Sequence, residues 1–244
     1  MQDAEMPHST ALKAHSFYKE LFSASNTMAN PEHVAIFENF IQDIKFEKLD
    51  ASEKSSLEAV FTKPELFSCL QKLVANGSSA PGYDALTYNN WFLSWEQSSP
   101  VIIFLANQLL QGNLLPGNNI AKVLIRLIPK KNYDRKKPSI NDLRPISLTN
   151  SLFRLINYAI TQRMMKPLNR IIPSNQQAFL RDRNIHLNIA TTKMIAHDIV
   201  STRSPNVNIM LIDFSKAFDN LDHSYMAKIL QLYDFPSSLI KSVI

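Results

Sequence analysis

Glycine and cysteine are both scarce in this chain of 244 residues, which contains four glycines and one cysteine, Cys69. A single cysteine excludes an intramolecular disulfide and a cysteine-rich zinc site. The few glycines exclude a collagen-like repeat and form no G-x-G-x-x-G motif for a dinucleotide. Gly77 and Gly82 have the spacing of a Walker A loop, but Tyr83 and Asp84 follow where Lys and Ser or Thr are needed. The sequence also lacks His-Glu-x-x-His, the zinc-protease motif.

Long apolar segments are missing as well, since no run approaches the roughly 18 residues that a membrane span requires. Residues 1–5 are polar and acidic, unlike a signal or transit peptide. We therefore expect no membrane segment and a reducing location inside the cell, in the nucleus or the cytoplasm. With 45% hydrophobic and 19% charged residues, the composition is that of a folded protein with one or two domains.

Positive charge is concentrated in the middle of the chain. Residues 120–185 contain fourteen Lys or Arg and three Asp, a net charge of +11, whereas the rest of the chain carries −6. Such segregation is typical of a surface that faces a polyanion, and nucleic acid is the first candidate. A solvated basic face explains the same charge equally well, so both interpretations stay open.

The apolar periodicity predicts an α+β protein with many helices and few strands. Helix starts are predicted where a small polar residue precedes a helical pattern: at Thr62, Asn150, Asn184 and Asp222. Another apolar helix is expected to begin at Ser99 and Pro100 and to end at Gly112.

Three strands are expected. Residues 123–128 and 144–148 predict an antiparallel hairpin, joined by the polar and basic connector 130–142. Residues 207–212 form a nearly continuous apolar run, which predicts a strand buried on both faces. This third strand would end directly at Asp213.

Asp213 needs an explanation, because burial of an unpaired carboxylate costs several kcal/mol. It would require a cation, a cap or a metal ion. An Asp that opens a turn and accepts backbone N–H groups is the more ordinary interpretation of such a position. The strand pattern alone leaves these alternatives open.

The segment 211–223 resembles motif A of the reverse transcriptases, in the form typical of non-LTR (LINE-type) retrotransposons. Other segments resemble further elements of this family in the same order: 15–22, 80–84, 127–131 with 142–148, and 176–184 followed by 188–189. Two positions depart from the family pattern. Ala85 and Asp182 stand where the family usually has glycine, which places the geometry of both turns in question.

The resemblance implies the fingers and the beginning of the palm of a right-hand polymerase over residues 61–244, preceded by a helical extension over residues 1–60. The family's Tyr-x-Asp-Asp hairpin is absent, and the sequence contains no Asp-Asp pair. We therefore expect an incomplete, truncated palm. A partner chain that supplies the rest of the palm is one open possibility.

The resemblance also implies a chemistry of two Mg²⁺ ions that transfer a nucleotide to a primer. Asp213 would be one metal ligand, and the main-chain carbonyl of Phe214 would be its companion. Because the incoming deoxynucleoside triphosphate needs further positive charge, Lys130 or Lys131 and Arg144 are its expected contacts.

Phe218 is implied as the aromatic residue that packs under the sugar and rejects a 2′-hydroxyl, although core packing is the ordinary role of a lone Phe. The basic segment would follow the phosphates of an RNA template and a DNA primer. Its candidate contacts are Arg135, Lys136, Lys137, Arg181 and Arg183.

Three functions are therefore compared. The first is part of an RNA-directed DNA polymerase, expected to be inactive as this chain because it offers one catalytic carboxylate. The second is a non-catalytic module that binds RNA or DNA on the polymerase scaffold. The third is a helical protein-interaction domain, which explains the helices but not five motifs in order.

Overall fold

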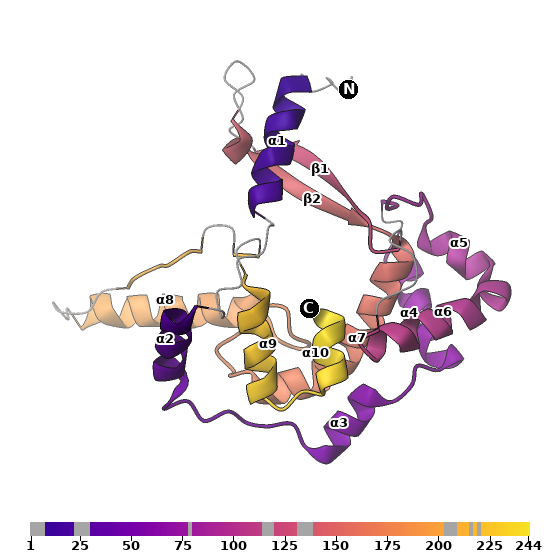
Figure 1. Ribbon diagram of the computed structural model, residues 1–244. Helices are drawn as coiled ribbons and strands as arrows, with labels where there is room; N and C mark the ends of the chain where they lie inside the picture. Colours follow the sequence, from indigo (N-terminus) through magenta and orange to yellow (C-terminus); the bar gives the residue numbers. More distant parts are fainter. Residues whose placement is uncertain are drawn as a thin grey trace.

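The computed structural model describes residues 8–21, 30–77, 80–113, 120–130, 139–202, 209–214, 217–218 and 221–244. In these ranges the helices are α1 (His8–Leu21), α2 (Pro31–Ile41), α3 (Ala51–Glu58), α4 (Lys63–Ala75), α5 (Tyr88–Leu93), α6 (Trp95–Leu110), α7 (Ser151–Ile171), α8 (Ile185–Ser201), α9 (His223–Leu232) and α10 (Ser237–Val243). Strands β1 (Val123–Pro129) and β2 (Leu143–Thr149) form an antiparallel hairpin. The predicted helix-rich α+β architecture is confirmed (Figure 1).

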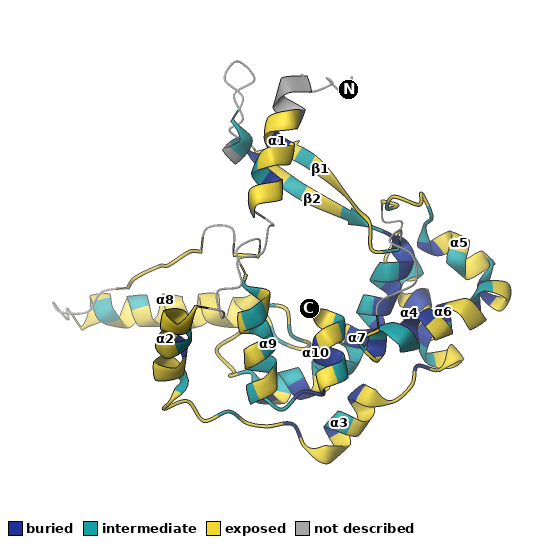
Figure 2. Cartoon of the chain, in the orientation of Figure 1, coloured by how far each residue is buried: buried dark blue, intermediate teal, exposed yellow. Residues whose placement is uncertain are grey.

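Helix α7 is the centre of the hydrophobic core. It contacts α3, α4, α5 and α6, and Figure 2 shows the buried residues gathered on α4, α6 and α7. The apolar residues that recur at helical spacing along α7 are all buried: Leu152, Leu155, Ile156, Ala159 and Ile160. The core therefore forms where the apolar side chains recur at helical spacing.

Local capping explains most of the helix starts. The hydroxyl of Thr62 accepts a hydrogen bond from the Glu65 amide, and the carboxylate of Asp222 accepts one from the Tyr225 amide. The Asn184 side chain caps α8 in the same way. These three predicted starts are confirmed, because each side chain satisfies an amide that has no partner inside its helix.

Helix α6 begins earlier than predicted. It starts at Trp95, so Pro100 lies inside the helix instead of in its first turn. The first turn is stabilised because the Ser98 amide donates to the Ser94 carbonyl over 2.9 Å and because Trp95 and Ser99 are buried in the core. The predicted end is confirmed, with Gly112 at a φ of +72° just after the helix.

The strand predicted over residues 207–212 is wrong in the described part of the segment, residues 209–212. These residues form no strand, and Met210, Leu211 and Ile212 are exposed. A strand needs a neighbour for its amides and carbonyls, but β1 and β2, which make up the sheet seen in the described ranges, pair only with each other. Without such a neighbour the described part of the apolar run stays irregular and exposed.

Arg163 connects α7 to the start of α4. Its Nε and Nη2 atoms each lie 2.7 Å from a carboxylate oxygen of Glu65. The guanidinium also donates to the carbonyls of Ala59 and Val60 and lies 3.9 Å from the centre of the Phe61 ring. A two-pronged pair of this kind fixes orientation as well as distance.

Arg170 makes a second connection, two helical turns further along α7. Its Nε and Nη2 atoms lie 3.0 and 2.6 Å from the two carboxylate oxygens of Glu53, and it also pairs with Glu47. Glu53 is only 8% exposed. The hydrogen bonds from Arg170 lower the pKa of the Glu53 carboxyl, and the Asp50 amide adds to this effect against the cost of burial.

Two cations of the basic segment thus serve the fold. Both Arg163 and Arg170 pair with carboxylates that lie outside residues 120–185. Part of the predicted N-terminal extension is tied to the same core, because the Leu49 amide donates to the Tyr233 carbonyl over 3.0 Å. The net charge of +11 therefore overstates the charge that residues 120–185 offer to a partner.

Replacing Arg170 by Met should lower the free energy of unfolding at pH 7 by roughly 2 kcal/mol, because it leaves the buried Glu53 carboxylate without its charged partner. The hydrogen bonds from Arg170 hold the native pKa of Glu53 below its ordinary value, so the stabilisation by the pair is fully present above the pKa of the unfolded chain. Its contribution is lost as the pH falls through the native pKa. Urea titrations should therefore show the two proteins converging in acid.

The control is Arg181→Met, which removes an exposed guanidinium with one side-chain partner, Gln162. It should change the stability by less than about 0.5 kcal/mol. Equal stabilities of Arg170→Met and the parent protein at pH 7 would contradict this account.

Candidate functional site

The β1–β2 hairpin projects from the start of α7 (Figure 1). It carries basic side chains on both strands. Its register pairs Arg126 with Ile146 and Arg144 with Ile128. Directly opposite residues share a face, and residues two apart on a strand do so too, so the two arginines lie on one face. Both are exposed. The hairpin predicted from residues 123–128 and 144–148 is confirmed.

Lys130 follows β1 at the outer end of the hairpin. Its amide donates to the Asp142 carbonyl over 2.7 Å, which continues the pairing of the two strands by one residue. Lys130 and Arg144 are therefore close to the same end of the hairpin, and both are exposed. The predicted contacts Lys131, Arg135, Lys136 and Lys137 lie outside the described residues.

A buried pair of polar residues holds the inner end of the hairpin. Asn150 is 2% exposed, and its side chain accepts a hydrogen bond from the Asp84 amide (3.2 Å) and donates one to the Ile120 carbonyl (3.1 Å). Asn150 does precede α7 as predicted, but its side chain makes no capping hydrogen bond. Its side-chain amide bonds instead to the Asp84 amide and the Ile120 carbonyl, two backbone groups from outside the helix.

Ser151 completes this junction. Its hydroxyl donates to the Leu86 carbonyl and accepts a hydrogen bond from Nε1 of Trp91, both over 2.8 Å. The Asn150–Ser151 junction thus joins the hairpin, the loop 80–86, α5 and α7. The segment 80–84 of the family resemblance meets the end of the segment 142–148 here, whereas residues 127–130 lie toward the outer end of the hairpin. The sequence signal for the junction was a polar pair between an apolar strand and an apolar helix.

The loop 80–86 fits the junction because residue 82 has no side chain. A Cβ atom on Gly82 would lie 2.5 Å from both the amide nitrogen and Oδ1 of Asn150, closer than atoms can approach. The Ala85 amide donates to the Gly82 carbonyl over 3.2 Å, and the Asp84 carboxylate accepts the Leu86 amide over 3.0 Å. Glycine is required here by close packing of backbone on backbone.

The two departures from the family pattern both lie in left-handed backbone. Ala85 has a φ of +59° and Asp182 a φ of +62°. This conformation brings Cβ close to the following carbonyl, a clash that glycine avoids. The turns keep the geometry that favours glycine even though the residues differ.

Arg183 organises the loop between α7 and α8. Its Nη1 atom donates to the carbonyls of Pro173 and Gln176, and its Nη2 atom donates to those of Asn169 and Ile172. Carbonyls at a helix C-terminus have no partner inside the helix, so a guanidinium here satisfies several at once. These bonds give Arg183 a positioning role, whereas Arg181 is exposed and keeps one side-chain bond to Gln162.

Asp213 and Phe214 are exposed on the irregular segment 209–214. Asp213 has no hydrogen bond or ion pair to another described residue, and in Figure 1 this segment lies apart from the hairpin. Within the described ranges, the structure therefore does not bring Asp213 against Lys130 or Arg144. It does bring Phe218 to Phe179, whose ring centre lies 6.2 Å away in an edge-to-face arrangement.

A divalent cation such as Mg²⁺ needs several oxygen ligands. No group of three His, Cys, Asp or Glu side chains comes together among the residues that are described. Asp213 alone does not fit such an ion, and the described side chains support no metal-dependent step.

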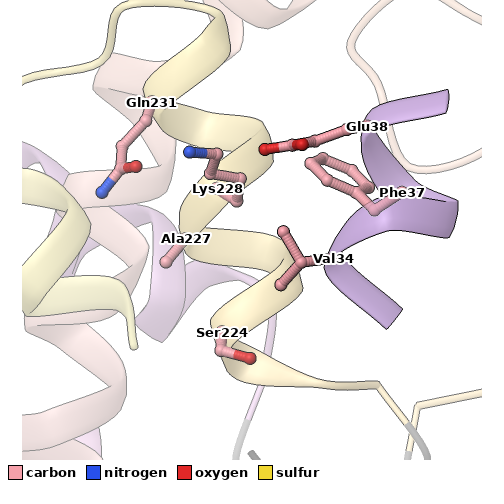
Figure 3. A pocket seen from close by; sticks show the side chains of 7 residues that line it. All are labelled: Val34, Phe37, Glu38, Ser224, Ala227, Lys228 and Gln231. Carbon is pink, nitrogen blue, oxygen red and sulfur yellow. The ribbon is translucent and has the colours of Figure 1, made fainter. Parts of the chain in front are cut away.

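A groove of about 240 Å³ lies elsewhere, between α2 and α9 (Figure 3). Val34, Phe37 and Ala227 form its apolar part, and Glu38 and Lys228 border it. Phe37 packs edge to face on Tyr225, with ring centres 5.1 Å apart. The groove contains no residue that the sequence singled out.

Comparison with known proteins shows two kinds of similarity. Residues 128–244 match the family described as reverse transcriptase (RNA-dependent DNA polymerase). The "Transposon TX1 uncharacterized 149 kDa protein" of Xenopus laevis is 27% identical over 231 residues, which cover 95% of this chain and 17% of that protein. The "Retrovirus-related Pol polyprotein from type-2 retrotransposable element R2DM" of Drosophila melanogaster is 29% identical over 168 residues, 68% of this chain and 15% of that protein.

The chain thus spans about a sixth of the length of these curated relatives. Across the described part of the chain, no helix combines the length and apolarity needed to cross a membrane.

Two substitutions in one turn should have opposite effects on stability. Gly82→Ala should lower the free energy of unfolding by about 2 kcal/mol, because its Cβ would push against the backbone of Asn150. Ala85→Gly should raise it by about 1 kcal/mol, because glycine relieves the left-handed strain. Urea unfolding followed by circular dichroism measures both.

Ser68→Gly, at an exposed position inside α4, is the control for the effect of glycine on a helix and should lower the free energy of unfolding by about 0.5 kcal/mol. A neutral Gly82→Ala, or a loss of stability in Ala85→Gly, would refute the proposed packing of this turn.

Proposed function

Because this chain belongs to the reverse transcriptases of LINE-type retroelements, we propose that it provides the fingers and the beginning of the palm of an RNA-directed DNA polymerase. The observation that carries the proposal is the Asn150–Ser151 junction. It fixes the base of a basic hairpin to the loop 80–86 and to the central helix, although these segments are far apart in the sequence. Such a junction gives the hairpin the firm base that a nucleotide-gripping element needs.

The hairpin is the proposed contact for the triphosphate of the incoming deoxynucleotide. Lys130 or Lys131 offers a mobile point charge, and Arg144 offers a planar fork that can take two phosphate oxygens at once. The exposure of Lys130 and Arg144 near one end of the hairpin supports this assignment. We propose that Phe218 contacts the sugar of the same nucleotide.

An RNA template and a DNA primer are the proposed nucleic-acid partners. The exposed Arg181, together with Arg135, Lys136 and Lys137, would contact their phosphates, while Arg183 would hold the loop that carries Arg181. Contacts of this type bind without regard to base sequence and weaken as salt is added. Arg126 extends the same basic face along the hairpin.

Asp213 and the main-chain carbonyl of Phe214 stay proposed as ligands for Mg²⁺, on the strength of the resemblance. No second carboxylate is placed beside them in the described residues, and the 244 residues contain no Asp-Asp pair. We therefore assign no step of nucleotide transfer to these two residues.

The second candidate function is a module that binds RNA or DNA without catalysis. The net charge of +11 on residues 120–185 favours binding without requiring a catalytic centre. The two functions differ in the nucleic acid that they prefer. A polymerase recognises the junction between primer and template, whereas a general binding module treats single strands alike.

Binding of a labelled RNA template annealed to a DNA primer tests the proposal. Fluorescence anisotropy over a salt series should show a logarithm of Kd that rises linearly with the logarithm of salt. Arg144→Ala should weaken binding and reduce that slope by about one, because one phosphate contact is lost. Lys72→Ala, which removes an exposed cation from α4, is the matched control and should leave the slope unchanged.

A clear preference for the primer–template over single-stranded RNA supports the polymerase, and equal affinities support the binding module. Equal slopes for Arg144→Ala and the parent protein would remove the hairpin from the proposed interface.

Primer extension by the 244-residue polypeptide with Mg²⁺ and deoxynucleotides should yield no product, because one carboxylate cannot hold two metal ions. Denaturing gels would resolve single-nucleotide additions. Templated extension that disappears in Asp213→Asn would show that our assignment of roles is incomplete.

A further inference from the structure

We infer that Phe179 and Phe218 form a stacking site for an unpaired base of single-stranded nucleic acid. The two rings come from segments 39 residues apart, and they meet edge to face with their centres 6.2 Å apart. Their exposed fractions are 82% and 81%. In this arrangement the edge of one ring meets one face of the other, so the remaining faces stay open to a flat ligand.

The loop that carries Phe179 is held from within. Gln177, which is 8% exposed, donates to the Ser174 carbonyl and accepts the Asn184 amide over 3.1 Å. Arg183 bonds four carbonyls of the same loop and of the end of α7. Hydrogen bonds therefore fix the loop without any contribution from the Phe179 ring.

Phe179 also has a φ of +65°, in the left-handed region. A bulky side chain pays a steric penalty in this conformation that glycine avoids. The ring is exposed, so its burial in the fold does not offset the penalty. Apart from its contact with Phe218, the strained and exposed Phe179 ring adds no packing to the fold, which points to a ligand.

The surroundings identify the class of ligand. Arg181 is exposed two residues after Phe179, and both lie in the segment that carries the net charge of +11. Aromatic faces next to cations are the pattern that binds single-stranded nucleic acid, because bases stack on the rings while phosphates meet the charges. We assign an unpaired base to the rings and its neighbouring phosphate to Arg181.

The inference rests on the proposed function in one respect, since that function makes nucleic acid the polyanion. The inference gives a role to Phe179, which has none in the proposed polymerase function. It also identifies the base as the part of the nucleic acid that is recognised. A protein segment that covers the rings is the competing occupant. Such a segment would need apolar surface but no flat ring.

The test compares two labelled probes, a twelve-residue oligouridylate and an abasic oligonucleotide of the same length and charge. Anisotropy titrations use the full 244-residue chain. Phe179→Gly should weaken binding of the oligouridylate about fivefold or more and should change binding of the abasic probe less than twofold. Phe218→Ala should behave in the same way, whereas Phe40→Ala, an exposed Phe of α2, should affect neither probe.

Thermal unfolding distinguishes a loss of base stacking from a loss of folded protein. Phe179→Gly should raise the midpoint of thermal unfolding, since it relieves the left-handed strain, while it weakens base-dependent binding. Phe179→Trp should keep the affinity for the oligouridylate, and Phe179→Leu should lose it, because only Trp has a flat face. Equal binding by the Trp and Leu variants would overturn stacking in favour of a general apolar contact.

The remaining outcomes separate the two proposals. If the parent protein binds both probes and Phe179→Gly changes neither affinity, nucleic-acid binding stands and the stacking site is overturned. If the parent protein binds neither probe at low salt, the proposed function and the stacking site are both overturned.

Discussion

The buried Asn150–Ser151 junction is the interaction on which the arrangement of this protein depends. Its two side chains satisfy backbone groups of the loop 80–86 and of the residue before the hairpin, together with the indole of Trp91. Buried polar groups without partners cost free energy, so each bond made here restricts where those segments can lie. The hairpin is exposed along most of its length and takes its direction from this base.

A second constraint acts through the far half of α7. Arg163 and Arg170 hold the start of α4 and the residues around α3 against this helix by two-pronged ion pairs. Helix α7 is thus anchored at its start by the hydrogen bonds of Asn150 and Ser151, and further along by those of Arg163 and Arg170. These bonds fix the position of the helix end from which the hairpin projects. Arg183 then turns the chain at the other end and leads it to α8. The basic segment thus combines cations that build the scaffold with cations that are left to face a partner.

Much of this architecture was predictable from the sequence because it depends on local rules. The apolar face of α7, the caps at Thr62, Asn184 and Asp222, and the hairpin all follow from side-chain spacing and from polar residues at element ends. The partners of Asn150 at the junction were not predictable, because Asn150 has the pattern of an ordinary cap and these partners lie 30 and 66 residues away. The family resemblance named Asp213, Lys130 and Arg144, but periodicity does not say which of them come together.

The prediction for residues 207–212 failed for a physical reason. An apolar run shows that burial of its side chains would be favourable. A strand also requires a neighbouring backbone for its hydrogen bonds, and no such neighbour lies along the described residues 209–212. At Ala85 and Asp182 the backbone is left-handed although the residue is not glycine, so here the structure forms without the expected residue. There the turn geometry persists although the residue best suited to it is missing, because the hydrogen bonds around each turn define the backbone.

Hydrogen exchange of the chain with and without a primer–template tests the central claim most directly, namely that the hairpin is the surface that meets nucleic acid. The account predicts slower exchange of amides in residues 123–129 and 143–149 when the primer–template is present, with no change in α3 and α4. Protection confined to the helices, with exchange in the hairpin unchanged, would contradict it.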